Sequence, residues 1–384
     1  MRLRKLKFNY TTMTEKNKLI KFYFNYNIKV DLEKSVYLIG SENELGNWNV
    51  RKANRLDCYN ENIWIKEMTL PYKVYKYKYF ISNKNAVDEK SISWLDEKER
   101  TFTSDELKCS SLEESRKDIK LMSFNLRYQN SIDGIHLWDN RKEMVIQIIM
   151  NNCADFVGFQ EGRLKQVEYI QESLPDFYKY IGHPRSEKED DEQCGILYDS
   201  NNYVVRDFGT FWLSDTPNIP GSITFENTLP RIVTWAKVYK FSNLVQNIDR
   251  AYFIFNTHFD HISEESRIKC ADFLVKQIDN LISKSSEKQM VLLISGDFNA
   301  EDDEVTIITL KQNGFVSTSD EKGNQEKTFH EFSGKADWKI DHIFYKLINI
   351  DISKVCEDYC VIKDKNSKGV FPSDHFPFCA KLLC

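Results

Sequence analysis

The chain has 384 residues, of which 41% are hydrophobic, and this is enough for two domains with buried cores. Its net charge is −5, but residues 1–117 carry 23 Lys and Arg against 17 Asp and Glu, whereas residues 118–384 carry 30 against 41. The acidic balance of the second part argues against a protein that grips long nucleic acids, because binding to a phosphate backbone depends on Lys and Arg.

Cysteine usage and hydropathy narrow the protein class further. The nine cysteines form no CxxC pair and no regular spacing, so neither a disulfide framework nor a zinc site is indicated. The first 22 residues lack the uninterrupted apolar stretch of a signal peptide, and no later run approaches the length of a membrane span. We therefore expect a soluble, cytoplasmic protein that has no membrane partner.

Residues 15–103 show the pattern of short strands. The runs at 19–30, 35–40, 62–70 and 74–81 alternate polar with aromatic or β-branched side chains, as strands with one buried face do. Clusters of turn-forming residues at 41–49 and 82–90 separate these runs. We predict an N-terminal all-β, immunoglobulin-like sandwich.

The turn at 40–48, the strand segment 77–79 and Trp94 make this region resemble the starch-binding modules of carbohydrate-binding family 20. The resemblance implies that Trp48 and Trp94 form a flat platform for glucose rings with Lys78 beside it, and that the partner is a polyglucan such as starch or glycogen. The C–H-rich face of a sugar suits an aromatic plane. Glu99-Arg100 departs from the Asn-Arg of the family and removes an amide partner. Burial in the core is the alternative for both tryptophans, because most tryptophans are largely buried.

Residues 104–117 are polar and lack apolar periodicity, which predicts a linker. From residue 118 to residue 384 the pattern changes to strands alternating with amphipathic helices, which is typical of a layered α/β domain. The predicted helices are at 141–152, 164–174 and 265–283. The predicted strands are at 120–128, 155–162, 194–199, 232–239, 252–261, 291–300, 338–345 and 371–383.

The run 292–300, LLISGDFNA, is central to the second domain. An apolar strand ends there in Gly-Asp-Phe-Asn, and side chains two apart on a strand project to the same side, so Asp297 and Asn299 point together from the sheet edge. An ordinary turn is the alternative, because Gly, Asp and Asn are common turn residues. What favours a site is that further polar residues also follow predicted strands: Asn125, Glu161, His258, Asp341, Asp374 and His375.

In order and spacing, these residues resemble the endonuclease/exonuclease/phosphatase superfamily over nearly all of residues 118–384. The resemblance implies a four-layer α/β sandwich of two packed sheets. It implies Mg²⁺, or Mn²⁺ in its place, held mainly by Glu161 with the help of Asn125 and Asp374. Oxygen ligands of this kind suit Mg²⁺, which binds through few carboxylates and keeps several waters.

The same resemblance implies the catalytic roles. His375 contacts the phosphoryl group and handles protons, Asp341 orients His375, Asp297 positions or deprotonates the attacking water, and Asn299 and His258 hold phosphate oxygens. The chemistry requires such groups, because negative charge gathers on the phosphoryl oxygens and a water must be aimed in line with the leaving group. A surface or core position is the alternative for any single histidine.

Two further stretches, 133–141 with Trp138 and Arg141, and 231–235, resemble a branch of bacterial members and, more distantly, the carbon catabolite repressor deadenylases. Arg231 is a candidate substrate contact, with an ion-paired arginine at a strand edge as the alternative. The acidic run 187–192 is expected to be a solvated loop away from any phosphate, which it would repel.

Three functions follow from these observations. The first is a Mg²⁺-dependent phosphoesterase that acts on a phosphate-ester substrate by in-line attack of water and is brought to starch-like or glycogen-like glucan by its N-terminal module. The second is a 3′-to-5′ exoribonuclease similar to the deadenylases, which the −11 charge of the second part disfavours. The third is a non-catalytic polyglucan-binding adaptor. It is the weakest of the three hypotheses, because the set of polar motif residues is complete.

Overall fold

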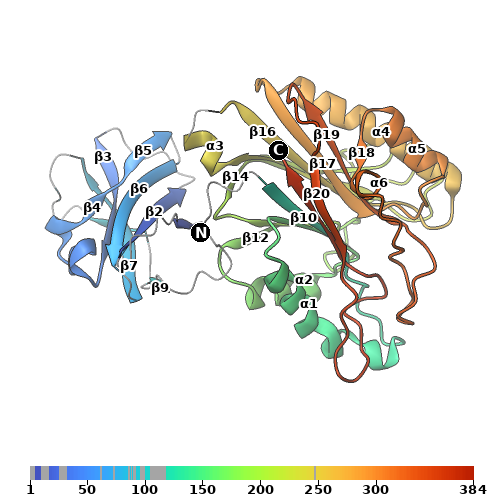
Figure 1. Cartoon of the computed structure of the whole chain (residues 1–384), viewed down its shortest axis with the longest axis horizontal. Helices are drawn as coiled ribbons and strands as arrows, with labels where there is room; N and C mark the ends of the chain where they lie inside the picture. Colours follow the sequence, from blue (N-terminus) through green and yellow to red (C-terminus); the bar gives the residue numbers. More distant parts are fainter. Residues whose placement is uncertain are drawn as a thin grey trace. The chain divides into compact units, whose positions relative to one another are not determined.

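A computed structural model describes residues 5–9, 17–25, 33–60, 63–71, 74–84, 87, 89, 92–95, 100–103, 118–245 and 248–384. The chain forms two compact units, Met1–Arg116 and Lys117–Cys384 (Figure 1). The predicted linker at 104–117 and the side chains of Glu99 and Arg100 lie outside the described residues, so the exact domain boundaries stay predictions.

The first unit is the predicted all-β sandwich. One sheet has the order β1-β2-β6-β5, and the other has the order β4-β3-β7-β8 with β9 also paired to β7. All strand pairs among the described residues of this unit are antiparallel. The bounds are β1 Lys5–Asn9, β2 Asn17–Asn25, β3 Lys34–Gly40, β4 Asn54–Arg55, β5 Asp57–Asn60, β6 Ile63–Pro71, β7 Val74–Asn83, β8 Ser93–Trp94 and β9 Arg100–Thr103.

The second unit contains two six-stranded mixed sheets. The first has the order β12-β13-β11-β10-β21-β20, and the second has the order β14-β15-β16-β17-β19-β18. The strands of the first sheet are β10 Asp118–Asn125, β11 Phe156–Gln160, β12 Tyr178–Ile181, β13 Ile196–Asp199, β20 Cys356–Val361 and β21 Phe378–Leu383. The strands of the second sheet are β14 Tyr203–Trp212, β15 Ile232–Lys240, β16 Arg250–His258, β17 Gln289–Asp297, β18 Val316–Ser317 and β19 Asp341–Ile348.

Helices cover the outer faces of these two sheets (Figure 1). One core joins α1 and α2 to the first sheet, and a second core joins α4 and α5 to the second sheet. The α-helices are α1 Trp138–Asn152, α2 Leu164–Ser173, α3 Phe241–Val245, α4 Glu264–Ser283, α5 Val305–Gln312 and α6 Thr318–Lys322. The arrangement is the predicted four-layer sandwich.

The two sheets of the second unit face each other across a third core. Leu121 and Phe156 of the first sheet and Ile254 and Leu293 of the second are fully buried in it. Burial of each such side chain contributes roughly 1.5–3 kcal/mol. This core fixes the sheets against each other, so that strand ends from both sheets keep a constant separation.

Toward the site the space between the sheets becomes polar. Gln160 Nε2 donates to Asn256 Oδ1 over 2.7 Å, and Asn256 Nδ2 donates to the carbonyl of Phe159 over 2.7 Å. Gly158 allows this close approach, because a Cβ there would lie 2.2 Å from Ser295 Oγ. Gln160 Oε1 has no partner in this network, but the remaining buried hydrogen bonds hold one relative position of the sheets more strictly than apolar contact does.

Two details differ from the sequence-based expectation that each polar motif follows a strand. Asp341 is the first residue of β19, and Asp374 and His375 lie in the loop before β21, which starts only at Phe378. Pro372 and Pro377 flank the latter pair and lack the N–H that a strand ladder needs. Because β19 and β21 run antiparallel to β17 and β10, their starts still lie at the edge where β17 and β10 end.

None of the helices in the described part of the chain combines the length and the hydrophobicity that a membrane crossing needs.

Candidate active site

The predicted site residues of the second unit gather at one end of the two sheets. In the second sheet, His258 of β16 pairs with Asp297 of β17, and Asp297 pairs with Asp341 of β19, so the three form one row across the strands. In the first sheet, Asn125 ends β10 and pairs with Gln160, the residue before Glu161. Residues more than 200 positions apart are thereby brought to one edge.

Asn125 and Glu161 are locked together. Asn125 Nδ2 donates to Glu161 Oε1 and to Asp297 Oδ2, both over 3.0 Å, while its Oδ1 accepts from the backbone N–H of Arg127. Glu161 Oε2 accepts from the N–H of Tyr128 over 3.1 Å. Glu161 has a left-handed backbone with a φ of 61°, a strained conformation for a residue with a side chain, which lifts the carboxylate out of the line of β11.

Asp297 lies in the middle of the group and is 2% exposed. Its Oδ1 accepts from the backbone N–H of Asn299, and its Oδ2 lies 3.5 Å from His258 Nε2 and 3.7 Å from His375 Nε2. Burial, together with the charge of Asp341, raises the pKa of Asp297 to about 7. A carboxyl with such a pKa can accept a proton near neutral pH.

His375 is held by Asp341. The imidazole Nδ1 lies 2.8 Å from Asp341 Oδ2, and the ring is 4% exposed. Burial lowers the pKa of His375, but the carboxylates of Asp341, Asp297 and Asp374 outweigh it and raise the pKa to about 10. His375 is therefore a cation at neutral pH.

The pKa of His258 is shifted in the opposite direction to that of His375. Burial and the neighbouring guanidinium groups of Arg231 and Arg185 hold the pKa of His258 well below its usual value. His258 is therefore a neutral ring that can donate one hydrogen bond and accept another. Two histidines of one site are thus fixed in different charge states, as a site with separate acid and hydrogen-bonding roles requires.

Asp374 and Arg231 complete the predicted set. Asp374 Oδ2 lies 3.7 Å from Arg127 Nε, and burial raises the pKa of this carboxyl. Arg231 is 3% exposed, its Nη2 lies 3.0 Å from His261 Nδ1, and its Nε has no hydrogen-bond partner. Arg231 also lies 3.9 Å from Asp260 and on the cavity wall, so the ion pair is present and the substrate contact stays a prediction.

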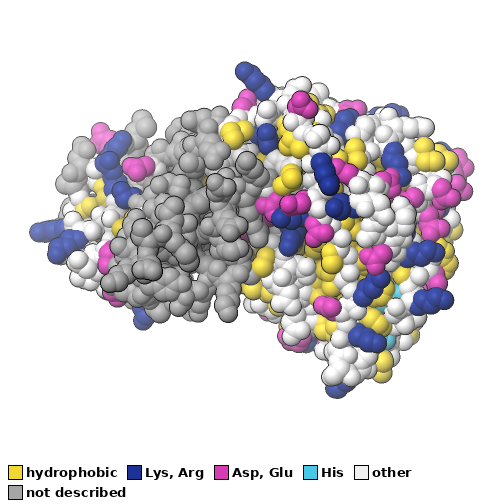
Figure 2. Space-filling view, viewed as in Figure 1, with side chains coloured by type: hydrophobic (Ala, Val, Ile, Leu, Met, Phe, Trp, Pro, Cys, Tyr) yellow, Lys and Arg dark blue, Asp and Glu magenta, His cyan; other side chains and the backbone are white. Residues whose placement is uncertain are grey.

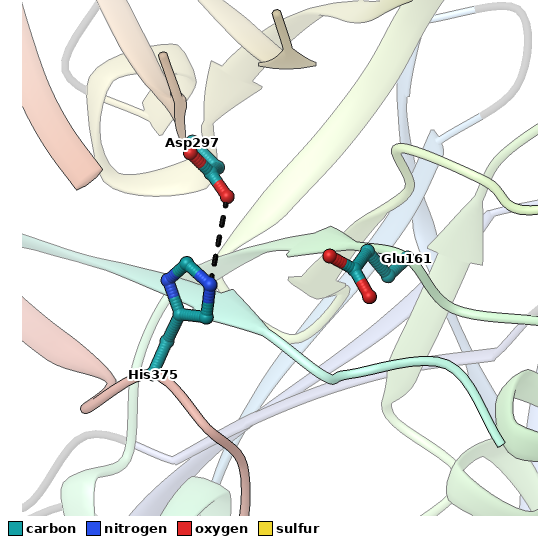
Figure 3. A group of neighbouring side chains, drawn as sticks. All are labelled: Glu161, Asp297 and His375. Carbon is teal, nitrogen blue, oxygen red and sulfur yellow. Dashed lines mark ion pairs between the residues drawn. The ribbon is translucent and has the colours of Figure 1, made fainter. Parts of the chain in front are cut away.

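Glu161, Asp297 and His375 point toward one another from three different elements (Figure 3). One potential ligand atom from each lies within 4.8 Å of the other two. The two carboxylates offer the hard oxygens that Mg²⁺ prefers, whereas His375 carries its proton and offers no lone pair at neutral pH. This close group shares Glu161 with the predicted metal ligands Glu161, Asn125 and Asp374, and the individual roles stay predictions.

A cavity of about 770 Å³ opens over this group. Its walls include predicted residues together with others that the sequence did not point to. The predicted residues that line it are Glu161, Arg231, His258, Asp297, Asn299, Asp374 and His375. Asn125 and Asp341 contact two of these residues, since Asn125 bonds to Asp297 and Asp341 bonds to His375. The additional residues include Arg127, Tyr128, Arg163, Arg185, His261, Phe329 and Phe332.

The expectation for the acidic run 187–192 is wrong at its last two residues. Asp191 and Glu192 line the cavity, where Arg185 pairs with both and offsets part of their negative charge. Burial and the charge of Glu161 raise the pKa of Glu192 to about 7. Nothing in the sequence indicates this placement, because the ion pairs form only once the loop has closed on itself.

Of the three predicted sugar-binding residues in the first unit, Lys78 lies on β7 and Trp94 on β8, whereas Trp48 lies in the turn that follows β3. Trp94 is 49% exposed and Trp48 is 36% exposed, so neither is a core residue. Lys78 Nζ lies 5.5 Å from the ring centroid of Trp94. Trp48 has a φ of 58° and follows Gly46, whose φ of 91° lets the turn close. Both indoles are thus accessible to a ligand.

Comparisons with known proteins agree with both units. The model of the starch binding domain matches residues 19–113, and that of the endonuclease/exonuclease/phosphatase family matches residues 122–375. An uncharacterized protein of Acanthamoeba polyphaga mimivirus is 28% identical over 280 residues, which are 67% of this chain and 98% of that protein.

Two solved structures are similar to the second unit. A mannosyl-6-phosphatase of Bacteroides thetaiotaomicron is 26% identical with a TM-score of 0.61, and the match covers 69% of this chain and 100% of the other. A conserved protein of Enterococcus faecalis is 27% identical with a TM-score of 0.60, and the match covers 69% and 99% of the two chains.

Proposed function

This chain belongs to the endonuclease/exonuclease/phosphatase family and carries a starch-binding domain before it, and from this we propose that it is a Mg²⁺-dependent phosphoesterase targeted to starch-like or glycogen-like glucan. The observation that carries the proposal is the convergence of Asp297, His375 and Glu161 in one cavity. The reaction is the hydrolysis of a phosphate ester by in-line attack of water.

The residues fit a divalent metal ion. Glu161 supplies a carboxylate that is already oriented by Asn125 and Tyr128, and Asp374 supplies a second carboxylate on the same cavity wall. Carboxylate oxygens match the preference of Mg²⁺, with Mn²⁺ as a substitute. When bound, the ion would neutralise charge on the phosphoryl oxygens.

Side chains of the protein carry out the proton transfer and hold the phosphoryl oxygens. Asp297 accepts a proton from the attacking water, because its pKa of about 7 suits a general base, and the N–H of Asn299 fixes its orientation. The His375 imidazolium donates a hydrogen bond to a phosphoryl oxygen where negative charge develops. His258, Asn299 and Arg231 hold the other oxygens. The new P–O bond forms as the ester P–O bond breaks, and the leaving oxygen takes up a proton.

The starch-binding domain would attach the enzyme to a polyglucan. The exposed Trp48 and Trp94 with Lys78 offer an aromatic face for glucose rings and a polar neighbour for their hydroxyl groups. Attachment to a polyglucan raises the effective concentration of the catalytic unit near esters on the same particle. The name of the Bacteroides relative, a mannosyl-6-phosphatase, supports a sugar-borne phosphate.

The surface charge supports this function over an exoribonuclease. On the face of residues 118–245 and 248–384 drawn in Figure 2, Lys and Arg side chains are interspersed with Asp and Glu rather than gathered in one basic stripe. A protein that tracks single-stranded RNA needs a positively charged groove with stacking aromatic side chains. The exoribonuclease is therefore the second candidate.

A direct test compares phosphate release from phosphorylated glucan and hexose phosphates with shortening of oligo(A), for the wild type and for Asp297→Ala. We expect phosphate release that requires Mg²⁺ and that is lost in Asp297→Ala. Faster shortening of oligo(A) would favour the exoribonuclease. Activity on neither substrate would favour the adaptor.

A further inference from the structure

The loop at 183–194 forms a wall of the cavity beside Glu161. Gln193 bridges to Gly162, the residue after Glu161, through the hydrogen bond from Gln193 N to Gly162 O of 2.9 Å. Trp212 Nε1 donates to the carbonyl of Arg185 over 2.6 Å and ties the loop to β14. The wall is therefore attached to both sheets.

Arg185 closes this loop with its side chain as well as its backbone. Its Nη1 and Nη2 donate to the two carboxylate oxygens of Glu192 over 2.8 and 2.9 Å, and its Nε donates to Asp191 Oδ1 over 3.1 Å. The N–H of Arg185 donates to the carbonyl of Glu192 over 2.9 Å. A bidentate arginine–carboxylate pair in this arrangement is rigid and directional.

The cationic groups of the cavity are not equivalent. Among its described lining residues, Arg127 pairs with Asp133, Arg163 pairs with Asp190 and Arg185 pairs with Asp191 and Glu192. The contact of the buried Arg231 is looser: its Nε lies 3.9 Å from Asp260 Oδ2 and has no hydrogen-bond partner. Arg231 and the imidazolium of His375, whose Nε2 lies 3.7 Å from Asp297, therefore keep N–H groups for a phosphate, whereas the arginines of the surrounding walls are paired with carboxylates.

Such a distribution fits a ligand with one phosphate on an uncharged, hydroxyl-rich carrier. A hydroxyl group can donate to a carboxylate and accept from a guanidinium at the same time, so an Arg–Glu pair is satisfied by sugar hydroxyls without losing its own contact. The wall at Asp191 and Glu192 has two carboxylates against the one guanidinium of Arg185, so a second phosphate beside the first would lie against an excess of negative charge and would be repelled.

From this we infer that the Arg185–Glu192 pair is a specificity-determining element that recognises the hydroxyl groups of a sugar phosphomonoester and disfavours substrates with an adjoining second phosphate. The inference rests on the proposed function and deepens it, because it names the substrate class and the residues that select it. The pair acts on the carrier of the phosphate and not on the phosphoryl transfer itself.

The test measures kcat/KM of the full chain in Mg²⁺ for a hexose 6-phosphate, for phenyl phosphate, which has no hydroxyl group, and for a nucleoside 3′,5′-bisphosphate. In Glu192→Gln, the preference for the hexose phosphate over phenyl phosphate should fall by about tenfold or more, because a hydrogen bond to a charged group is lost. The preference over the bisphosphate should fall as well, since a repelling charge is removed. Glu187→Gln, an exposed residue of the same loop, is the matched control and should keep both preferences.

The outcomes separate this inference from the proposed function. If the wild type hydrolyses none of the three esters, the proposed function fails and the inference fails with it. If the wild type hydrolyses them but Glu192→Gln changes all three rates by the same factor, only the inference is overturned, because Glu192 then supports the fold or the metal. Should Glu192→Gln not fold, Arg185→Lys, which keeps the charge but loses the bidentate contact, must show the same loss of preference.

Discussion

Nδ1 of His375 lies 2.8 Å from Oδ2 of Asp341, and both residues are almost completely buried. The two belong to different elements, since Asp341 begins β19 and His375 lies in the loop before β21. The pairing fixes the orientation of the imidazole, raises its pKa to about 10 and leaves Nε2 directed toward Asp297 at 3.7 Å. Because 3.7 Å is too long for a hydrogen bond, the Nε2–H group is the charged donor that a substrate can meet.

Replacement of Asp341 by Asn tests this pairing through the pH profile. Because the wild-type pKa is about 10, activity that needs the imidazolium is complete at neutral pH and is lost as the pH rises through about 10. Without the carboxylate, the pKa of His375 should fall toward 6.5 or below, and the same loss should occur at correspondingly lower pH. We expect kcat/KM at neutral pH to fall by roughly a hundredfold or more. Asp337→Asn, an exposed change in the same segment, should leave the profile in place.

Glu161→Gln tests the metal site. The change keeps the size of the side chain but removes the charge, so the Mg²⁺ concentration for half-maximal phosphate release should rise by at least roughly tenfold. Mg²⁺ should raise the melting temperature of the wild type and not that of the variant, because an ion that binds only the folded state stabilises it. Glu168→Gln on the exposed face of α2 serves as the control. Full wild-type activity in EDTA would contradict metal dependence.

The sequence predicted most of the layered fold, because the spacing of apolar residues along the chain shows which face of a strand or helix is buried. The strand at 291–300 and the helix at 265–283 correspond to β17 and α4, and one face of β17, with Leu292 and Ile294, shares a core with α4. Site residues were also found where a motif stands at a strand end, as Asp297 does. The prediction failed where direction matters, since the sequence does not tell whether Asp341 ends one strand or begins the next.

Other parts of the site could not be found in the sequence because they depend on contacts between distant segments. Arg185 and Glu192 are neighbours only after the loop has closed, and the inter-sheet network of Gln160 and Asn256 joins two strands 96 positions apart. The resemblance of residues 133–141 to one branch of the family pointed to Arg141, but it did not indicate which groups the side chain contacts. In the sequence, polar residues of this kind look the same as ordinary surface residues until their partners are known.

Trp48→Ala tests the first unit. Because Trp48 is exposed and offers an aromatic face, its removal should weaken binding to insoluble starch by at least about fivefold, which corresponds to about 1 kcal/mol. Co-sedimentation of the full chain measures this. Trp338→Ala is the matched control, since Trp338 is likewise exposed, at 49%, but belongs to the second unit, and the variant should sediment as the wild type does. Unchanged binding in Trp48→Ala would reject the platform.

Arg141 is the largest fully buried side chain of the described residues, and it connects the segments that carry the site. Its guanidinium donates to the carbonyl of Pro372 over 3.0 Å, to that of His136 over 2.9 Å and to those of Leu126 and Arg127. The loop after Asn125 and the loop before Asp374 are thus held by one residue of α1.

Arg141→Met should therefore lower stability and activity together. The variant fills similar space but leaves four carbonyl groups without their donor, and each unsatisfied buried group costs about 1–3 kcal/mol, so a loss of about 3 kcal/mol or more is expected. The urea midpoint at which phosphate release is lost measures the effect. Arg206→Met on the exposed part of β14 should change the stability by less than about 0.5 kcal/mol. Equal midpoints for the two variants would show that the loops keep their positions without Arg141, and that the buried guanidinium is not what holds Asn125 and Asp374 in the site.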